Sequence, residues 1–278
     1  MGYFKSSWKY LFSKGMFFMF IFLIPAALMP FILSPSSMFR ALCAFELQNP
    51  EGYTVMFLKM FVDYRYIWIG AIGLLVGIFA TSIVFGTIDR HMRTGQFNLS
   101  LKRINVRINY NVATAARFVL LMFMAFLIYL FLNFLFFMLW ATISKEYVTF
   151  YVLCSISFIL ISILYAVVLA IIILWPPFML HTGLTSGNAF RMSFAQINGC
   201  IMKIAFNIIF ISLPFYLVML LNAVFGWSVI LGIVLDGLCM LFVYHYYIVL
   251  MYTIFYDVTG LERMDQVNAK KMNIWKIK

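Results

Sequence analysis

Long apolar runs alternate with short polar segments along the whole chain. The runs cover about residues 16–33, 66–88, 115–142, 147–175, 203–225 and 229–254. A helix needs roughly 20 residues to cross the hydrocarbon core of a bilayer, which is about 30 Å thick. Each run approaches or exceeds that length. The pattern therefore predicts six transmembrane helices and an all-α integral membrane protein.

Two of the connections between runs are very short. The third and fourth runs meet at 144–146, and only a few residues around Gly226 and Trp227 separate the fifth from the sixth. Helices joined by so short a segment pack as antiparallel neighbours. We therefore expect the six helices to form three hairpins.

Three polar segments, which lead into the first, third and fifth runs, carry apolar residues at helical spacing. This spacing places the apolar side chains on one face of a helix, and such a helix with basic residues beside that face lies on a membrane surface. Each hairpin is therefore expected to follow a cytoplasmic amphipathic helix. The apolar residues are Phe4, Trp8, Leu11 and Phe12, then Phe97, Leu101, Ile104 and Ile108, and finally Phe190, Phe194, Ile197 and Ile201.

This recurrence gives the chain a repeat-like organisation. The units lie at about 1–88, 90–180 and 185–256, and a basic cytoplasmic tail follows at 257–278. Lys14 and Pro25 in the first unit are spaced like Lys203 and Pro214 in the third. We interpret residues 1–278 as a single transmembrane domain built from three related units.

The segment 97–111 fits two different periods. Its apolar residues alternate as in a strand, and four of them also fall on one helical face, with Leu99, Val106 and Tyr110 on the opposite side. Periodicity alone allows both structures. An isolated strand at the membrane surface would leave its edge hydrogen bonds unpaired, so we favour a helix.

Composition supports a membrane location. Apolar residues make up 65% of the chain and charged residues 10%, against roughly 45–50% and 25% in soluble domains. The net charge of +11 is interpreted as the cytoplasmic bias of a membrane protein rather than as a nucleic-acid-binding surface. We expect no nucleic-acid partner.

Basic residues predict the orientation of the chain, because Lys and Arg resist translocation. If the N-terminus is cytoplasmic, sixteen basic residues fall on the inner side and four on the outer side. This asymmetry predicts a multipass protein of the cytoplasmic membrane with both termini in the cytoplasm. The four outer residues are Arg40, Lys59, Arg65 and Lys145.

Few polar residues fall inside the predicted spans. Asp236 lies about seven residues below the outer end of the sixth run, and an intramembrane acid is a candidate functional group because burying its charge is expensive. The alternative is a structural carboxyl group, protonated or hydrogen-bonded to Ser155 or Ser157. His245 stands among tyrosines, as in an interfacial aromatic belt. Asn207 is a further buried polar candidate, expected to link helices.

Two other sets of residues have a predicted role. Contact with lipid or a partner is expected on the inner face, where basic side chains meet anionic headgroups. Gly70, Gly73 and Gly77 form a small-residue face in the second run, typical of close helix packing within the chain or between copies,. The basic candidates are Arg90, Arg93, Lys102, Arg103 and Arg107.

Signatures of catalysis are missing from the sequence. It contains no P-loop, no serine-nucleophile elbow and no HExxH motif,. His91 and His181 stand in cytoplasmic segments without carboxylates at metal-binding spacing,. We therefore expect no enzymatic activity, no metal and no cofactor.

The segment TSGNAFRMSFAQINGCIMKI, residues 185–204, resembles the repeated element of poorly characterised bacterial multipass families. These include the membrane region attached to some glycerophosphodiester phosphodiesterases. The shared features are a small-residue turn, a helix start of the form Ala-aromatic-basic-x-Ser, and Gly or Asn before a span. The catalytic barrel of those proteins has no counterpart here, so the resemblance implies a helical membrane module without hydrolytic activity.

Two functional hypotheses follow. The first is a non-enzymatic module that binds anionic inner-leaflet lipids, a partner protein or a second copy of the chain, because the predicted amphipathic helices are basic and the spans contain little polarity. The alternative is a transporter or lipid flippase that uses Asp236, which the prolines and the repeat-like units would also suit.

Overall fold

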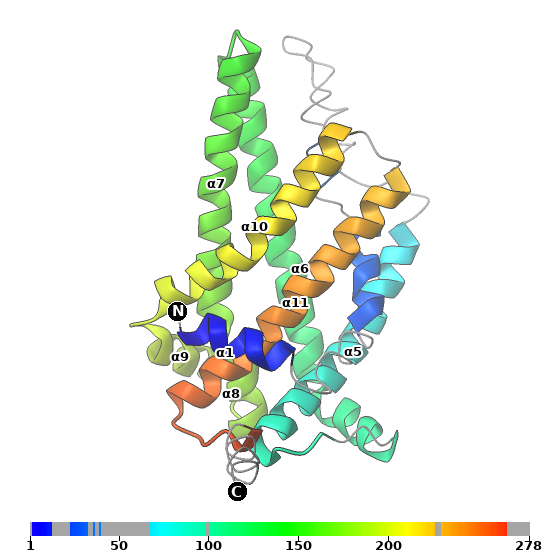
Figure 1. The fold of residues 1–278 in the computed structure, drawn as a ribbon, viewed down its shortest axis with the longest axis vertical. Coiled ribbons are helices and arrows are strands. Elements are labelled where there is room, and N and C mark those ends of the chain that lie inside the picture. Colours follow the sequence, from blue (N-terminus) through cyan, green and yellow to red (C-terminus); the bar gives the residue numbers. More distant parts are fainter. Residues whose placement is uncertain are drawn as a thin grey trace, which may run out of the picture.

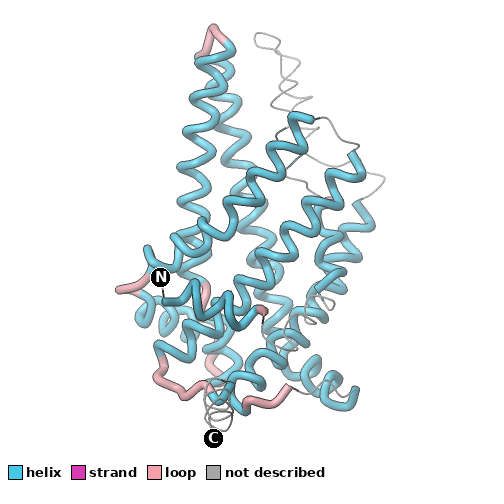
Figure 2. The backbone as a smooth tube through the Cα atoms, viewed as in Figure 1, coloured by secondary structure: helices cyan, strands magenta, loops and turns pink. Residues whose placement is uncertain are grey.

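The structure is a computed structural model that describes residues 2–12, 23–32, 36, 39, 67–97, 101–225 and 229–265. These residues are mostly helical, with short loops, and contain no strand, which confirms the predicted all-α class for this part (Figures 1 and 2). The helices are α1 (Gly2–Leu11), the 3-10 helix η1 (Ile24–Phe31), α5 (Ile67–Thr94), α6 (Leu101–Ile143), α7 (Tyr147–Ile172), α8 (Trp175–Thr182), α9 (Ser186–Ile197), α10 (Ile201–Phe225) and α11 (Val229–Val258).

Five helical segments within the described residues are long and apolar enough to cross a membrane. They coincide with the last five predicted spans, and lie at Ile67–Thr94, Ile108–Ile143, Tyr147–Thr182, Ile201–Asn222 and Ile230–Val258. Of the first predicted span, 16–33, the structure describes residues 23–32. The helix in this part, η1, has eight residues and is too short to cross a bilayer alone. Pro25 and Pro30 lie in η1, and proline lacks the backbone N–H that an α-helix requires.

The helices converge at one end of the molecule and diverge at the other (Figure 1). We call the end where α5 and α11 finish the basic end, and the end with the α6–α7 turn at 144–146 the turn end. Near the basic end nearly every residue of α11 from His245 to Tyr256 is buried. Toward the turn end the same helix exposes Ile230 and Leu238, and α5 exposes Trp68 and Leu75. Large apolar side chains at these positions are stable facing lipid.

The helix α6 differs from the predicted arrangement. It is continuous over 43 residues, so residues 101–111 are helical, as favoured over a strand, but they form the first turns of the spanning helix instead of a separate amphipathic helix. Hydrogen bonds to α5 hold these turns: Ser82 Oγ donates to the carbonyl oxygen of Ile108, and Asn111 Nδ2 donates to that of Ser82, both at 3.3 Å.

The helix α9 is separate from α10, as the amphipathic pattern predicts, but it buries a different face. Ala189, Ser193 and Ile197 are buried, whereas Phe190 and Phe194 are exposed. The buried residues are one turn apart, and the small side chains of Ala189 and Ser193 let the start of α9 lie close to the bundle,. The two phenylalanine rings therefore point outward.

The segment around η1 is packed between α5 and α11 at two glycines. A Cβ atom added at Gly70 would overlap with Ile32, and one added at Gly237 would overlap with the carbonyl oxygen of Ala27. Only glycine permits so close an approach of two backbones. The other two glycines of the predicted small-residue face, Gly73 and Gly77, are also buried in α5.

We expect Gly237→Ala to destabilise the protein by about 1–3 kcal/mol, because the added methyl group must displace the backbone of η1. The measurement is the midpoint of thermal unfolding in detergent, followed by size-exclusion chromatography. Gly187→Ala is the matched control, since nothing lies within 4 Å of the added Cβ in α9. Equal midpoints for the two variants would show that the close contact at Gly237 does not exist.

Candidate functional site

A network of polar side chains joins three helices at the basic end. The Asp89 carboxylate of α5 accepts a hydrogen bond of 3.0 Å from the Tyr256 hydroxyl of α11. The same oxygen lies 2.5 Å from Nε2 of His181, which belongs to α8. The His181 ring packs on Phe255 with 4.7 Å between centroids. The three helix ends are therefore tied together by one partly buried carboxylate.

A second group of contacts fastens α1 across the same end. The Tyr10 hydroxyl lies 2.9 Å from Nδ1 of His91. The Arg263 guanidinium lies 5.5 Å from the centre of the Tyr10 ring, within the range of a cation–π interaction. Tyr3 donates a hydrogen bond of 2.6 Å to Asp257. These contacts connect the start of the chain to α5 and to the segment after α11.

Both tyrosines of α1 are held in the neutral form. Burial raises the pKa of Tyr10 well above its ordinary value, and the carboxylate of Asp265 adds to the effect. The pKa of Tyr3 is also raised, first by burial and then by its hydrogen bond to Asp257. A neutral hydroxyl remains a hydrogen-bond donor. Both hydroxyls are therefore available as donors across the physiological pH range.

His181 is paired with a carboxylate that lies far from it in the sequence. Asp89 and His181 are 92 residues apart in the chain, whereas metal-binding motifs are recognised from ligands a few residues apart. The two residues lie at the ends of two apolar segments, and no local sequence pattern indicates that they pair. Within the described residues, no group of three or more His, Cys, Asp or Glu side chains is arranged to hold a metal ion.

Asp236 is fully buried in α11. One carboxylate oxygen accepts a hydrogen bond of 3.0 Å from the backbone N–H of Ser36, and the other accepts one from the Ser36 hydroxyl. Hydrogen bonds to both oxygens stabilise a carboxyl group in apolar surroundings. Asp236 therefore anchors the chain just beyond η1 to α11, next to the close contact at Gly237.

The serines expected to pair with Asp236 are bonded elsewhere. Ser155 donates to the carbonyl oxygen of Tyr151 at 2.8 Å, within its own helix. Ser157 accepts a hydrogen bond of 2.6 Å from the indole N–H of Trp140. The sequence signal that would have found the partner is the segment Ser34-Pro35-Ser36-Ser37, the polar stretch directly after the first apolar run.

The other intramembrane candidates are packed inside the bundle. His245 is fully buried, so it lies inside the protein and not in an aromatic belt facing the membrane interface. Asn207 is also buried, and its amide nitrogen donates to the carbonyl oxygen of Lys203 at 2.7 Å. That bond lies within α10 and does not link two helices.

The basic candidates all lie toward the basic end. Arg93 is exposed, whereas Arg90 is partly buried, with an enclosed Nε atom that has no hydrogen-bond partner. The other three residues lie in the first turns of α6, and their side chains are outside what the structure describes. They are Lys102, Arg103 and Arg107.

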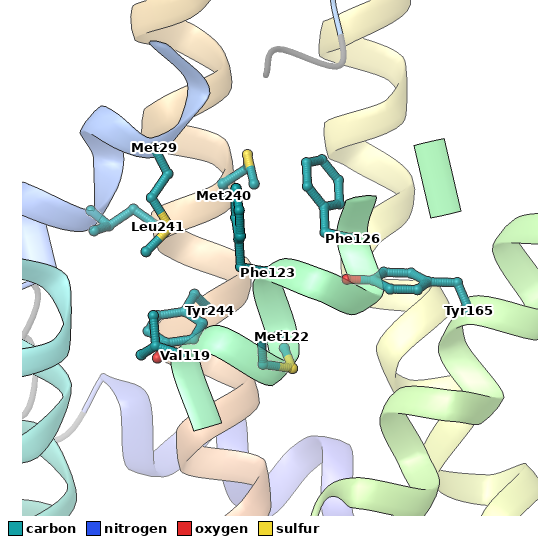
Figure 3. Close-up of a pocket in the computed structure, with 9 residues that line it drawn as sticks. All are labelled: Met29, Val119, Met122, Phe123, Phe126, Tyr165, Met240, Leu241 and Tyr244. Carbon is teal, nitrogen blue, oxygen red and sulfur yellow. The ribbon is translucent and has the colours of Figure 1, made fainter. Parts of the chain in front are cut away.

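A cavity lies in the middle of the bundle between α6 and α11 (Figure 3). It occupies about 100 Å³ and is partly open, so it is smaller than the pockets of roughly 300–1,000 Å³ that enclose a drug-sized ligand. Its walls are apolar, and Tyr165 of α7 points toward it from the side opposite α11. The lining residues are Met29, Val119, Met122, Phe123, Phe126, Tyr165, Met240, Leu241 and Tyr244.

Comparison with known proteins assigns no relative to this chain. No family model matches it, and neither a curated protein nor a solved structure is significantly similar to it. The proposal for its function therefore rests on the residues and contacts described above.

We expect Ser36 and Asp236 to be energetically coupled. In a double-mutant cycle with Ser36→Ala and Asp236→Asn, the two changes should be less destabilising together than the sum of the single effects, by about 0.5–3 kcal/mol. Thermal or denaturant unfolding in detergent measures each variant. Ser155→Ala combined with Asp236→Asn provides the control cycle, and additivity in both cycles would contradict the contact.

Removal of the Tyr10 hydroxyl should loosen α1. Tyr10→Phe loses a buried hydrogen bond to His91, a loss that costs about 1 kcal/mol. Hydrogen exchange of the α1 amides should therefore be faster in this variant. Tyr110→Phe is the control because Tyr110 is 83% exposed. Identical exchange of α1 in both variants would rule out the anchoring role of Tyr10.

Proposed function

We propose that the protein is a non-enzymatic module of the cytoplasmic membrane that binds anionic lipids at the inner leaflet through α1 and α9. The observation that carries the proposal is the pattern of side chains that these helices expose. On α1, Lys5, Trp8, Lys9 and Phe12 are all exposed and follow the spacing of one helical face. Aromatic and basic side chains therefore alternate along this face.

The helix α9 presents the same combination of side chains. Arg191 is exposed between Phe190 and Phe194, while the small face of the helix packs on the bundle. At a bilayer surface the rings enter the acyl region, and the charged groups reach the headgroups. Anionic headgroups strengthen this binding by about 1 kcal/mol for each Lys or Arg near the surface.

The proposal includes six membrane spans with both termini in the cytoplasm. Its support is the distribution of charge over the described residues. Basic side chains occur at or toward the basic end, including those on α1, α5 and α9, and Lys145 at the α6–α7 turn is the exception. Lys and Arg concentrate on the cytoplasmic side of membrane proteins, so the basic end is assigned to that side. Lys102, Arg103 and Arg107 would extend the same surface.

Transport through Asp236 lacks comparable support. Both oxygens of this carboxyl group accept hydrogen bonds from Ser36, and Asp236 is not among the residues that line the central cavity. A group that carries a proton or an ion must exchange its ligands during each cycle. The observed bonding favours a structural role for this acid.

The test is lipid binding by the triple variant Lys5→Gln, Lys9→Gln, Arg191→Gln. Its affinity for phosphatidylglycerol should fall about fivefold for each charge removed, because each contributes about 1 kcal/mol. Lipid exchange into nanodiscs, followed by native mass spectrometry, measures the bound fraction. Lys145→Gln should leave binding unchanged, since this exposed lysine lies at the opposite end of the bundle.

Two results would overturn the proposal. One is equal phosphatidylglycerol binding by the triple variant and by the unmodified protein. The other is an equal loss of binding in Lys145→Gln, which would show that the effect depends on net charge and not on the surface of α1 and α9.

A further inference from the structure

The central cavity has a position and a lining that suggest its occupant. Met240 lies eleven residues after the start of α11 at Val229, which corresponds to about 16 Å along the helix. This depth is near the middle of a hydrocarbon core of about 30 Å. At that depth the medium around the protein consists of lipid chains, and water is absent.

Aromatic rings hold the cavity open. Phe118 of α6 is stacked on Tyr244 and Tyr247 of α11, with centroid distances of 6.2 and 6.1 Å. These rings keep the two helices apart by the width of a side chain on the side of the cavity toward the basic end. Farther along α6, Tyr129 packs on Tyr165 of α7 at 4.8 Å. The cavity lies between these two aromatic contacts.

Two hydroxyl groups near the cavity are already bonded. Tyr244 shares a hydrogen bond of 2.9 Å with Thr81, and Tyr129 shares one of 3.1 Å with Ser162. Tyr165 also lines the cavity and directs its hydroxyl toward it, and the rest of the lining is formed by Met and Phe side chains and by aliphatic groups. Such a surface offers dispersion contacts to an apolar ligand, and methionine adapts to its shape.

We infer that this cavity binds a segment of one hydrocarbon chain of a membrane phospholipid, the rest of which lies in the surrounding bilayer. An empty apolar cavity weakens the fold, because the atoms that line it lack contacts on one side. A hydrocarbon chain that enters the cavity restores these contacts. The cavity is partly open, so a chain from the surrounding bilayer can enter without unfolding the protein. This site goes beyond the proposed function. The surface of α1 and α9 is proposed to bind lipid headgroups, whereas the cavity contacts the hydrocarbon chain of a lipid.

The test uses phospholipids that carry a photoactivatable diazirine near the end of one acyl chain. The full-length protein in nanodiscs is irradiated, and peptide mass spectrometry locates the adducts. Adducts are expected on Met122, Phe126 and Met240. Labels on phosphatidylcholine and phosphatidylglycerol should give similar yields there, because the headgroup makes no contact with the cavity.

Two variants of one helix provide the matched comparison. Met122→Trp fills the cavity and should lower the adduct yield in its walls at least fivefold. Met124→Trp should leave the yield unchanged, since Met124 is 54% exposed on the outer side of α6. Met240→Phe is a smaller change on α11, on the other side of the cavity, and should also lower the yield. It replaces Met122→Trp as the test if that variant does not fold.

Three outcomes would overturn the inference. The first is adducts confined to exposed residues such as Met124, and the second is an unchanged yield in the folded cavity variants. The third is labelling by phosphatidylglycerol alone, which would assign the lipid to a headgroup site. Cavity labelling should persist in the triple variant of Lys5, Lys9 and Arg191, so the failure of one proposal can be told apart from the failure of the other.

Discussion

The contact of η1 with Gly70 of α5 and Gly237 of α11 is the constraint on which the centre of the molecule depends. It brings the backbone of a short, proline-containing helix against two long helices where no side chain intervenes. The position of Met29 above the cavity and the approach of Ser36 to Asp236 both follow from it. In α11, Gly237 forms the close contact with η1, and the neighbouring Asp236 binds Ser36, which follows η1 in the sequence.

The two ends of the bundle are stabilised differently. At the basic end, polar side chains such as Asp89, His181 and Tyr256 bond to one another around a fully packed core. Toward the turn end the helices separate and expose large apolar residues. A soluble protein could not maintain this second arrangement, because exposed apolar surface is unfavourable in water. In lipid it carries no such penalty, so the splayed half is stable only in a membrane.

Hydropathy alone predicted much of the fold. The five later apolar runs coincide with long helices because each residue of such a run favours lipid independently of its distant neighbours,. The helical structure of 101–111 also followed from the need to satisfy backbone hydrogen bonds. Its continuity with α6 did not, because an amphipathic pattern does not reveal whether a helix breaks before the span that follows.

The candidate sites were much less predictable. Asp236 was recognisable as an acid within an apolar run, but Ser36, its partner, lies 200 residues away in the chain. Asp89 and His181 are also distant in sequence, and the cavity depends on rings contributed by several helices. Pairing of this kind is set by three-dimensional packing, and a single sequence contains no periodic signal for it.

The unequal lengths of the apolar helices have a consequence for the bilayer itself. The helix α6 contains 43 residues, whereas α10 contains 25, so at 1.5 Å per residue they measure about 64 and 38 Å. We therefore expect the flank with α6 to present a taller hydrophobic surface than the flank with α10, and a tilt of α6 to reduce the difference. The remaining mismatch stretches the lipids on one side more than on the other. Such a protein is expected to gather where thicker and thinner regions of membrane meet.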